Sequence, residues 1–153
     1  AAANNRGDLV VFMAAMKSMF VKKGRLLHHS PGYAAMVFWM KNIIIKKGKF
    51  RVRCRVADTL LARANGLMFS SLRKDEGLLF VFPAEEQVDI HMLFVFFPLD
   101  VAWLNSKRKI IQIKRNVKPF TPFVSGVKAK YLLEVRKGAA DALHVGDTLS
   151  INI

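Results

Sequence analysis

Short segments in which apolar and polar residues alternate dominate this chain from Ile43 onward. A period of two puts successive side chains on opposite sides of a strand, so each segment can turn one side to a core. The pattern predicts strands at residues 43–45, 50–57, 77–82, 88–96, 100–104, 110–113, 131–135 and 149–153. Two short helices are predicted, one ending at Gly66 and one over 139–144 that Gly146 closes. We expect an α+β, mainly β fold, a compact curved or barrel-like sheet with two short helices.

Residues 1–40 differ from the rest in composition and charge. The 153-residue chain is 52% hydrophobic, enough for one core, and carries 25 Lys and Arg against 11 Asp and Glu, a net charge of +14. Residues 1–50 hold nine basic residues and one acidic residue, so much of the excess charge precedes the strand-rich region. We predict a basic N-terminal extension at 1–40, outside the core, followed by a single β-rich domain at 41–153. Met40 is an alternative start of translation.

The apolar run Leu9–Val21 is the strongest candidate for a targeting or membrane segment. It is interrupted by Lys17 and is shorter than the roughly 20 apolar residues that a spanning helix needs. Basic residues follow this run, whereas in a secretory signal they precede the apolar core. A cytoplasmic location is therefore favoured. Peripheral membrane binding is the alternative, through an apolar stripe formed by Phe12, Met16, Met19 and Phe20.

Cys54 is the only cysteine, which excludes an intrachain disulfide and a thiolate metal cluster within one chain. It alternates with arginines and shares a strand face with valines, so we predict a buried core residue. The adjacent His28 and His29 lack further ligands and make a poor metal site. No glycine-rich phosphate loop or nucleophile elbow is recognised. We expect no metal and no cofactor.

His91 and Asp100 stand out because they interrupt an apolar run and flank Pro98, where a strand must bend or end. A buried polar group is unfavourable unless it has a partner. We predict a His91–Asp100 hydrogen bond that orders the bend, with an acid–base dyad as the alternative. Glu134 lies between two apolar residues, and alternation predicts that it points outward into solvent.

Asp58 and Arg63 flank the first predicted helix. Asp58 or Thr59 is expected to cap this helix, with Leu60, Leu61 and Ala64 on or near its buried face. Arg63 is expected to face Glu76 or Asp100, either as a structural ion pair or for anion capture.

Several sequence blocks occur in the order found in one known family. They are Val56-Ala57-Asp58-Thr59, Arg63 with Gly66-Leu67-Met68-Phe69, Asp75 to Phe82, Ile90-His91-Met92, Phe97-Pro98-Leu99-Asp100-Val101, Tyr131-Leu132-Leu133-Glu134, Gly138 and Gly146-Asp147. From about residue 50 to 153 the chain resembles domain-of-unknown-function family 192, in the variant of archaeal and some bacterial members. The resemblance implies a compact, mainly β domain and supplies no established activity.

We therefore predict a ligand- or partner-binding module, for a small ligand or a protein, with a site near Asp58, Arg63, His91 and Asp100. One alternative is a small hydrolase or isomerase that uses His91 and Asp100. The other is a nonspecific nucleic-acid-binding protein with an anion-binding surface near Phe120 and Phe123. The basic residues of that surface are Lys107, Arg108, Lys109, Lys114 and Arg115.

Overall fold

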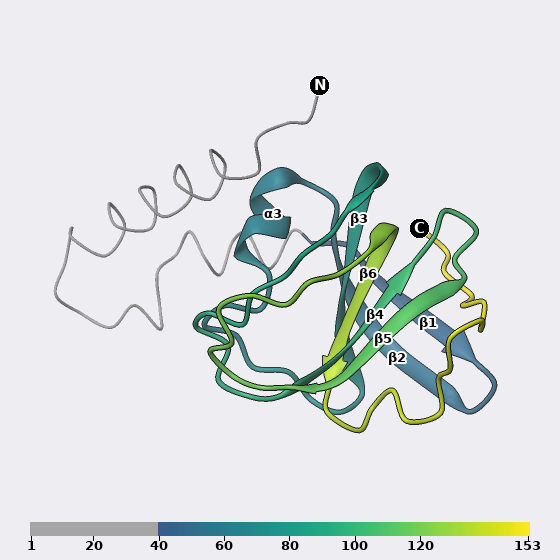
Figure 1. The fold of residues 1–153 in the computed structure, drawn as a ribbon. Helices are drawn as coiled ribbons and strands as arrows, with labels where there is room; N and C mark the ends of the chain where they lie inside the picture. Colours follow the sequence, from purple (N-terminus) through teal and green to yellow (C-terminus); the bar gives the residue numbers. More distant parts are fainter. Residues whose placement is uncertain (1–39) are drawn as a thin grey trace, which may run out of the picture. The chain divides into compact units, whose positions relative to one another are not determined.

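The computed structural model describes residues 40–153. The predicted N-terminal extension and its apolar stripe lie outside these residues, so they stay predictions. The described elements are β1 (Asn42–Lys47), β2 (Phe50–Ala57), α3 (Leu60–Asn65), β3 (Glu76–Gln87), β4 (Leu99–Leu104), β5 (Ile110–Val117) and β6 (Lys128–Arg136) (Figure 1).

All six strands belong to one mixed sheet with the order β1-β2-β3-β6-β4-β5. β2 and β3 run parallel, and the other neighbouring strands are antiparallel. A barrel would need β1 to pair with β5, but these strands form the two opposite edges. The expected mainly β fold is confirmed, whereas the barrel-like closure is wrong.

Three predicted elements are absent from the described residues. Residues 88–96 and 149–153 contain isolated bridges, Ile90 to Val124 and Lys46 to Ser150, instead of continuous strands. Residues 139–144 form turns instead of a second helix, with a bond from Leu143 N–H to the Ala140 carbonyl. So short a helix is unstable alone and needs packing that favours it. Here the tertiary contacts select turns.

The alternation of buried residues divides the core between the two faces of the sheet. One face packs against the C-terminal segment, and we call it the C-terminal face; its core includes Cys54, Leu79, Ala102, Leu133, Val135, Ala140, Leu143, Leu149 and Ile151. The other face packs against loops and α3, and we call it the loop face; its core includes Ala62, Leu67, Leu78, Met92, Val95, Phe97, Val101, Trp103, Val124 and Leu132. Cys54 is buried as predicted, and burial raises the pKa of its thiol to about 12.

Two long connections, residues 88–98 and 118–127, lie side by side over the loop face (Figure 1). Met92 joins them twice, because its N–H donates to the Thr121 carbonyl at 2.7 Å and its own carbonyl accepts from Phe120 N–H at 3.0 Å. Under them Trp103 is fully buried, and its Nε1 donates to the Val88 carbonyl at 2.8 Å. The connections therefore form a hydrogen-bonded cover.

Helix α3 begins at Thr59, whose Oγ1 accepts from Ala62 N–H at 3.2 Å, and ends at Gly66 with φ of 49°. Thr59, not Asp58, is therefore the cap among the two predicted candidates. Ala62 is the buried residue of this helix, while Leu60 and Leu61 are 72% and 65% exposed. The expected burial of the two leucines is wrong because a helix this short buries only one narrow stripe.

Candidate functional site

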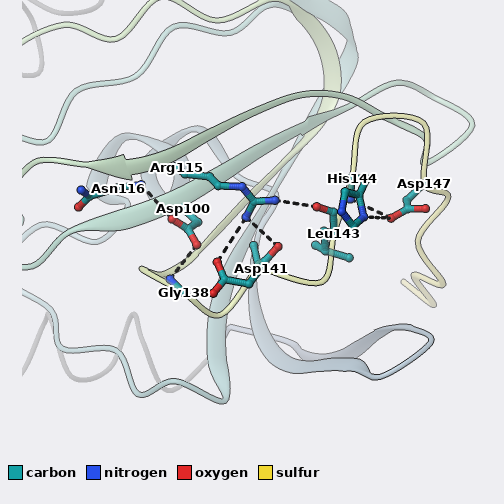
Figure 2. Close-up of polar contacts among 9 residues, drawn as sticks. Asp100, Arg115, Asn116, Gly138, Asp141, Leu143, His144 and Asp147 are labelled. Atoms are coloured by element: carbon teal, nitrogen blue, oxygen red, sulfur yellow. Dashed lines mark hydrogen bonds and ion pairs between the residues drawn. The ribbon is translucent and has the colours of Figure 1, made fainter.

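Asp100 lies on the C-terminal face and is 2% exposed. Its two carboxylate oxygens accept from the backbone N–H groups of Asn116, at 2.9 Å, and Gly138, at 2.8 Å. Figure 2 shows the carboxylate between β5 and the turn that follows β6. Buried N–H groups need acceptors, so the Asp100 carboxylate connects β4, β5 and the turn after β6. Both of its oxygens have hydrogen-bond donors.

Arg115, next to Asn116 in β5, contacts the turns that follow β6. Its guanidinium donates to the carbonyls of Ala140, at 2.9 Å, and Leu143, at 2.7 Å, and lies 3.7 Å from the Asp141 carboxylate (Figure 2). These contacts hold the turns at the point where a second helix was predicted. Lys114 Nζ likewise donates to the Ser125 carbonyl at 2.5 Å. Arg115 and Lys114, two of the five residues of the expected anion-binding surface, are thus engaged by the protein itself.

Lys107, Arg108 and Lys109 lie in the turn between β4 and β5. Asn105 Oδ1 accepts from the N–H groups of Lys107 and Lys109, each at 3.0 Å, so the turn is ordered while its basic side chains remain exposed. Phe120 follows β5, whereas this turn precedes it, so the eight-residue strand separates them. Because a strand rises about 3.3 Å per residue, the eight residues of β5 keep the basic turn and Phe120 apart, at opposite ends of the strand.

Arg63 is directed at backbone carbonyls and an aromatic ring, and not at Glu76 or Asp100 as expected. Its Nη1 donates to the carbonyls of Asp58, at 2.8 Å, and Val81, at 3.1 Å. Its guanidinium carbon lies 5.4 Å from the centre of the Phe82 ring. Arg63 thus ties α3 to β3, and the exposed Asp58 contributes its carbonyl, not its carboxylate, to this contact.

His91 is half-buried in the cover of the loop face, and its Nδ1 accepts from Leu93 N–H at 3.3 Å. Burial lowers the pKa of its imidazole, which favours the neutral form. Within residues 40–153 no hydrogen bond joins His91 to Asp100. The four predicted site residues therefore belong to three separate contact networks.

An exposed group of phenylalanines, which sequence analysis missed in large part, lies where the segment after α3 meets the cover of the loop face. Phe69 and Phe94 are stacked with ring centroids 4.8 Å apart, and Phe96 meets Phe120 edge to face at 5.2 Å. Phe69 and Phe96 lie 6.3 Å apart and join the two pairs. We call these four residues the aromatic surface. The sequence signal that could have identified it is the run Leu93-Phe94-Val95-Phe96-Phe97, in which every residue is apolar although Phe94 and Phe96 are exposed.

Three residues of the aromatic surface have left-handed backbones: Phe69, Phe94 and Phe120, with φ of 55°, 58° and 59°. This conformation is unusual for a bulky side chain and costs roughly 1 to 2 kcal/mol for each residue. The hydrogen bond from Phe69 N–H to the Phe94 carbonyl, 2.9 Å long, helps to fix it. The backbone is therefore held in an unfavourable conformation where the rings gather.

Glu134 is the second residue that the sequence interpretation missed. It was expected to point into solvent, but it is 5% exposed and lies on the loop face between Leu78 and Val101 of the neighbouring strands. Within the described residues its carboxyl group forms no hydrogen bond or ion pair. Burial raises the pKa of Glu134 to about 8, so the neutral acid predominates at pH 7.

Two further features are absent from residues 40–153, a cluster of metal ligands and a membrane-spanning helix. In this part of the chain no three His, Cys, Asp or Glu residues are grouped so that they could hold a metal ion. No helix among the described residues is long and apolar enough to cross a bilayer.

The fold defines a class of protein, a small, mainly β domain built on one open mixed sheet. The model of domain-of-unknown-function family 192, described as Uncharacterized ACR, matches residues 43–151, and the chain belongs to this family. The predicted family is thus confirmed, and it is a family of uncharacterised function for which no catalytic activity is indicated.

Archaeal relatives agree with this assignment. A UPF0127 protein of Pyrococcus furiosus is 36% identical over 113 residues, which cover 71% of this chain and 95% of the relative. A UPF0127 protein of Thermococcus sibiricus is 33% identical over 114 residues, which cover 70% and 73%.

Solved structures share the fold. A crystal structure of a protein of unknown function from Novosphingobium aromaticivorans has a TM-score of 0.63 at 22% identity and covers 73% of this chain and 85% of its own. A crystal structure of a protein from Sinorhizobium meliloti, described as a putative transcription regulator, has a TM-score of 0.65 at 23% identity and covers 71% of this chain and 91% of its own.

Proposed function

We propose that this domain is a binding module that docks a partner protein on the aromatic surface. The observation that carries the proposal is the contact chain of Phe69, Phe94, Phe96 and Phe120, each of which remains between 38% and 59% exposed. Clustered exposed aromatic rings are costly in water and are typical of the centres of protein interfaces. Phe123, in the same loop as Phe120, adds a further exposed ring.

The backbone supports the same interpretation. Left-handed phenylalanines oppose folding, yet three of them occur at this one place, where Phe69 N–H donates to the Phe94 carbonyl and Phe120 N–H donates to the Met92 carbonyl. A rigid platform also binds with a smaller loss of conformational entropy than a mobile loop. The unfavourable backbone conformation of these phenylalanines is therefore consistent with a surface that presents its rings to a partner in a fixed arrangement.

Charge indicates the chemistry of the partner. The three segments that carry the aromatic surface, residues 66–70, 93–97 and 118–123, contain one charged residue, Lys118, and no acidic residue. The whole chain carries +14, so a second copy would approach against like charge. We infer that the partner presents apolar side chains inside an acidic rim.

The four residues predicted from the sequence take supporting roles in this proposal. Arg63 and Asp58 fix α3, next to the segment that carries Phe69, and His91 lies beside Met92 in the cover. Asp100 holds the opposite face. An enzyme that uses His91 and Asp100 finds no support in this geometry, because no hydrogen bond joins them in the described residues.

The test is selection of binding peptides from a random phage-displayed library against the full chain. We expect enrichment of peptides that combine aromatic or aliphatic residues with Asp and Glu. Phe96→Ser and Phe120→Ser should each weaken their binding by about tenfold or more, since an anchor residue contributes at least 1.4 kcal/mol. Val145→Ser is the matched control, because Val145 is also an exposed large apolar residue but lies in the C-terminal segment.

Three outcomes would overturn the proposal. Selected peptides without apolar residues, or binding that the Phe96 and Phe120 variants leave unchanged, would exclude the aromatic surface. Self-association that depends on Phe96 would replace the partner by a second copy. Tight binding of single-stranded oligonucleotides, with a steep salt dependence and loss in the Phe120 variant, would make the surface a base-stacking platform instead.

A further inference from the structure

A second feature of the molecule, independent of the aromatic surface, is a cavity of about 240 Å³ beside the start of the parallel strand pair. Its walls come from β1, β2, β3 and the segment before β3. The residues that line it are Asn42, Arg53, Arg55, Ser71, Glu76 and Gly77. The cavity is too small for a large cofactor but has room for a small ligand or a single acidic group.

The strand geometry explains why two arginines meet there. Arg53 and Arg55 alternate with buried Val52, Cys54 and Val56, so both side chains project from the loop-face side of β2. The antiparallel register sets Asn42 opposite Arg55, and the parallel register sets Glu76 opposite Arg53. Two guanidinium groups and an amide therefore share one small cavity with the hydroxyl of Ser71.

Only part of this positive charge is neutralised by the protein. Arg73 holds the Glu76 carboxylate through its backbone N–H at 3.1 Å and its Nε at 3.4 Å. Asp75 lies 3.7 Å from Arg53 and 3.5 Å from Arg73, and all three of these side chains are more than half exposed. Within residues 40–153 the Arg55 guanidinium has neither a hydrogen bond nor an ion pair.

We propose that this cavity binds the oxyanion of a small ligand, a carboxylate or phosphate group, with Arg55 as its principal partner. A guanidinium presents N–H donors in a planar fork that matches two oxygens of such a group. Arg53 supplies a second positive charge, and Ser71 and Asn42 supply neutral donors. Of these donors, the Asn42 amide already makes one long bond, 3.4 Å, to the Met40 carbonyl.

Inorganic phosphate and acetate are the probes, titrated separately into the full chain and followed by backbone amide chemical shifts. We expect saturable shifts that centre on Arg55 and Gly77 for at least one of them, and the preferred probe distinguishes a phosphate site from a carboxylate site. Arg55→Gln should weaken that binding by about tenfold or more, as expected when a charge-assisted contact is lost. Arg55→Lys should bind with intermediate affinity, because it keeps the charge without the fork.

Arg51→Gln is the matched control. Arg51 lies on the same face of the same strand and is exposed, but it does not line the cavity. Its replacement removes the same charge and should change the affinity by less than about twofold, as expected for a screened surface charge. Equal losses in the Arg51 and Arg55 variants, or shifts that fail to saturate for both probes, would overturn the proposal. Peptide binding to the aromatic surface should be unchanged in Arg55→Gln, so the two proposals can fail separately.

Discussion

Asp100 and Glu134 are both buried carboxyl groups, one on each face of the same sheet, and their surroundings differ. Asp100 receives two backbone hydrogen bonds and joins β4, β5 and the C-terminal turns. Glu134 has apolar neighbours on the adjacent strands and no hydrogen bond or ion pair within the described residues. The comparison teaches that burial alone does not tell whether a carboxyl group stabilises a fold. The donors around it decide.

The largest effect expected from this comparison is the pH dependence of stability at Glu134. The pKa of its carboxyl is raised from an ordinary 4.5 to about 8 in the folded protein. Below pH 4.5 the carboxyl group is protonated in both the folded and the unfolded protein, so it does not make the free energy of unfolding depend on pH. Between these two values only the unfolded chain releases the proton, so the free energy of unfolding falls by about 1.4 kcal/mol for each pH unit. Above pH 8 the loss is complete.

Glu134→Gln removes this titration. We expect the variant to gain about 4 kcal/mol relative to the unmodified protein when the pH is raised from 4.5 to 8. Urea unfolding at a series of pH values measures the difference, and Glu86→Gln, at an exposed position, is the control. A difference that does not change with pH would show that Glu134 is ionised in the folded protein.

The next effect concerns the packing of the loop face. Gly126 has no space for a side chain, since a Cβ there would collide with the Val88 carbonyl and the Trp103 indole. Gly126→Ala should therefore break the Trp103–Val88 hydrogen bond and lower the free energy of unfolding by about 3 kcal/mol. Guanidinium chloride unfolding tests this, with Ser125→Ala at the exposed neighbouring position as control. Equal stabilities of the two variants would refute the close packing.

Asp100→Ala probes the C-terminal face. The substitution leaves the N–H groups of Asn116 and Gly138 without their acceptor, and we expect a loss of about 2 kcal/mol. Asp100→Asn keeps one acceptor oxygen and should lose less. The midpoints of thermal unfolding, compared at one pH, measure both. If the alanine variant melts at the temperature of the unmodified protein, Asp100 does not hold these segments together.

The smallest effect is expected from removal of the N-terminal region. Residues Trp39–Ile153 form one compact unit, and the family match lies within it, so we propose that a fragment beginning at Met40 folds alone. Its free energy of unfolding should equal that of the full chain within about 0.5 kcal/mol. Differential scanning calorimetry would detect the alternative, a fragment that has lost its cooperative transition.

Much of the fold could be predicted from the sequence, and the reason is local. The sequence predicted β2, β4 and β6 and the buried Cys54, and in β2 period two fixes which side of the strand each residue occupies. Alternation failed at residues 88–96, which alternate like a strand but form a loop. Alternation reports burial on one side only, and a loop lying on a core produces the same pattern as a strand.

The candidate site was predicted less well. Asp100 was expected to be buried with hydrogen-bond donors and is, because a carboxylate inside an apolar run needs partners. The partner of Asp100 was predicted to be His91, but its donors are N–H groups of Asn116 and Gly138, which lie 16 and 38 residues further along the chain. Such partners depend on strand order, which hydrophobic periodicity does not encode.

The sequence by itself determined the family, the β-rich class and the positions that face a core, since these depend on residue type and spacing. Only the tertiary structure decided the strand order, the burial of Glu134 and the meeting of the phenylalanines. Phe69, Phe94 and Phe120 come from three distant segments, and they gather because the segment after α3 and the two long connections meet over the same face of the sheet. Contacts between segments far apart in the chain are set by how the faces are covered, and each segment alone lacks that information.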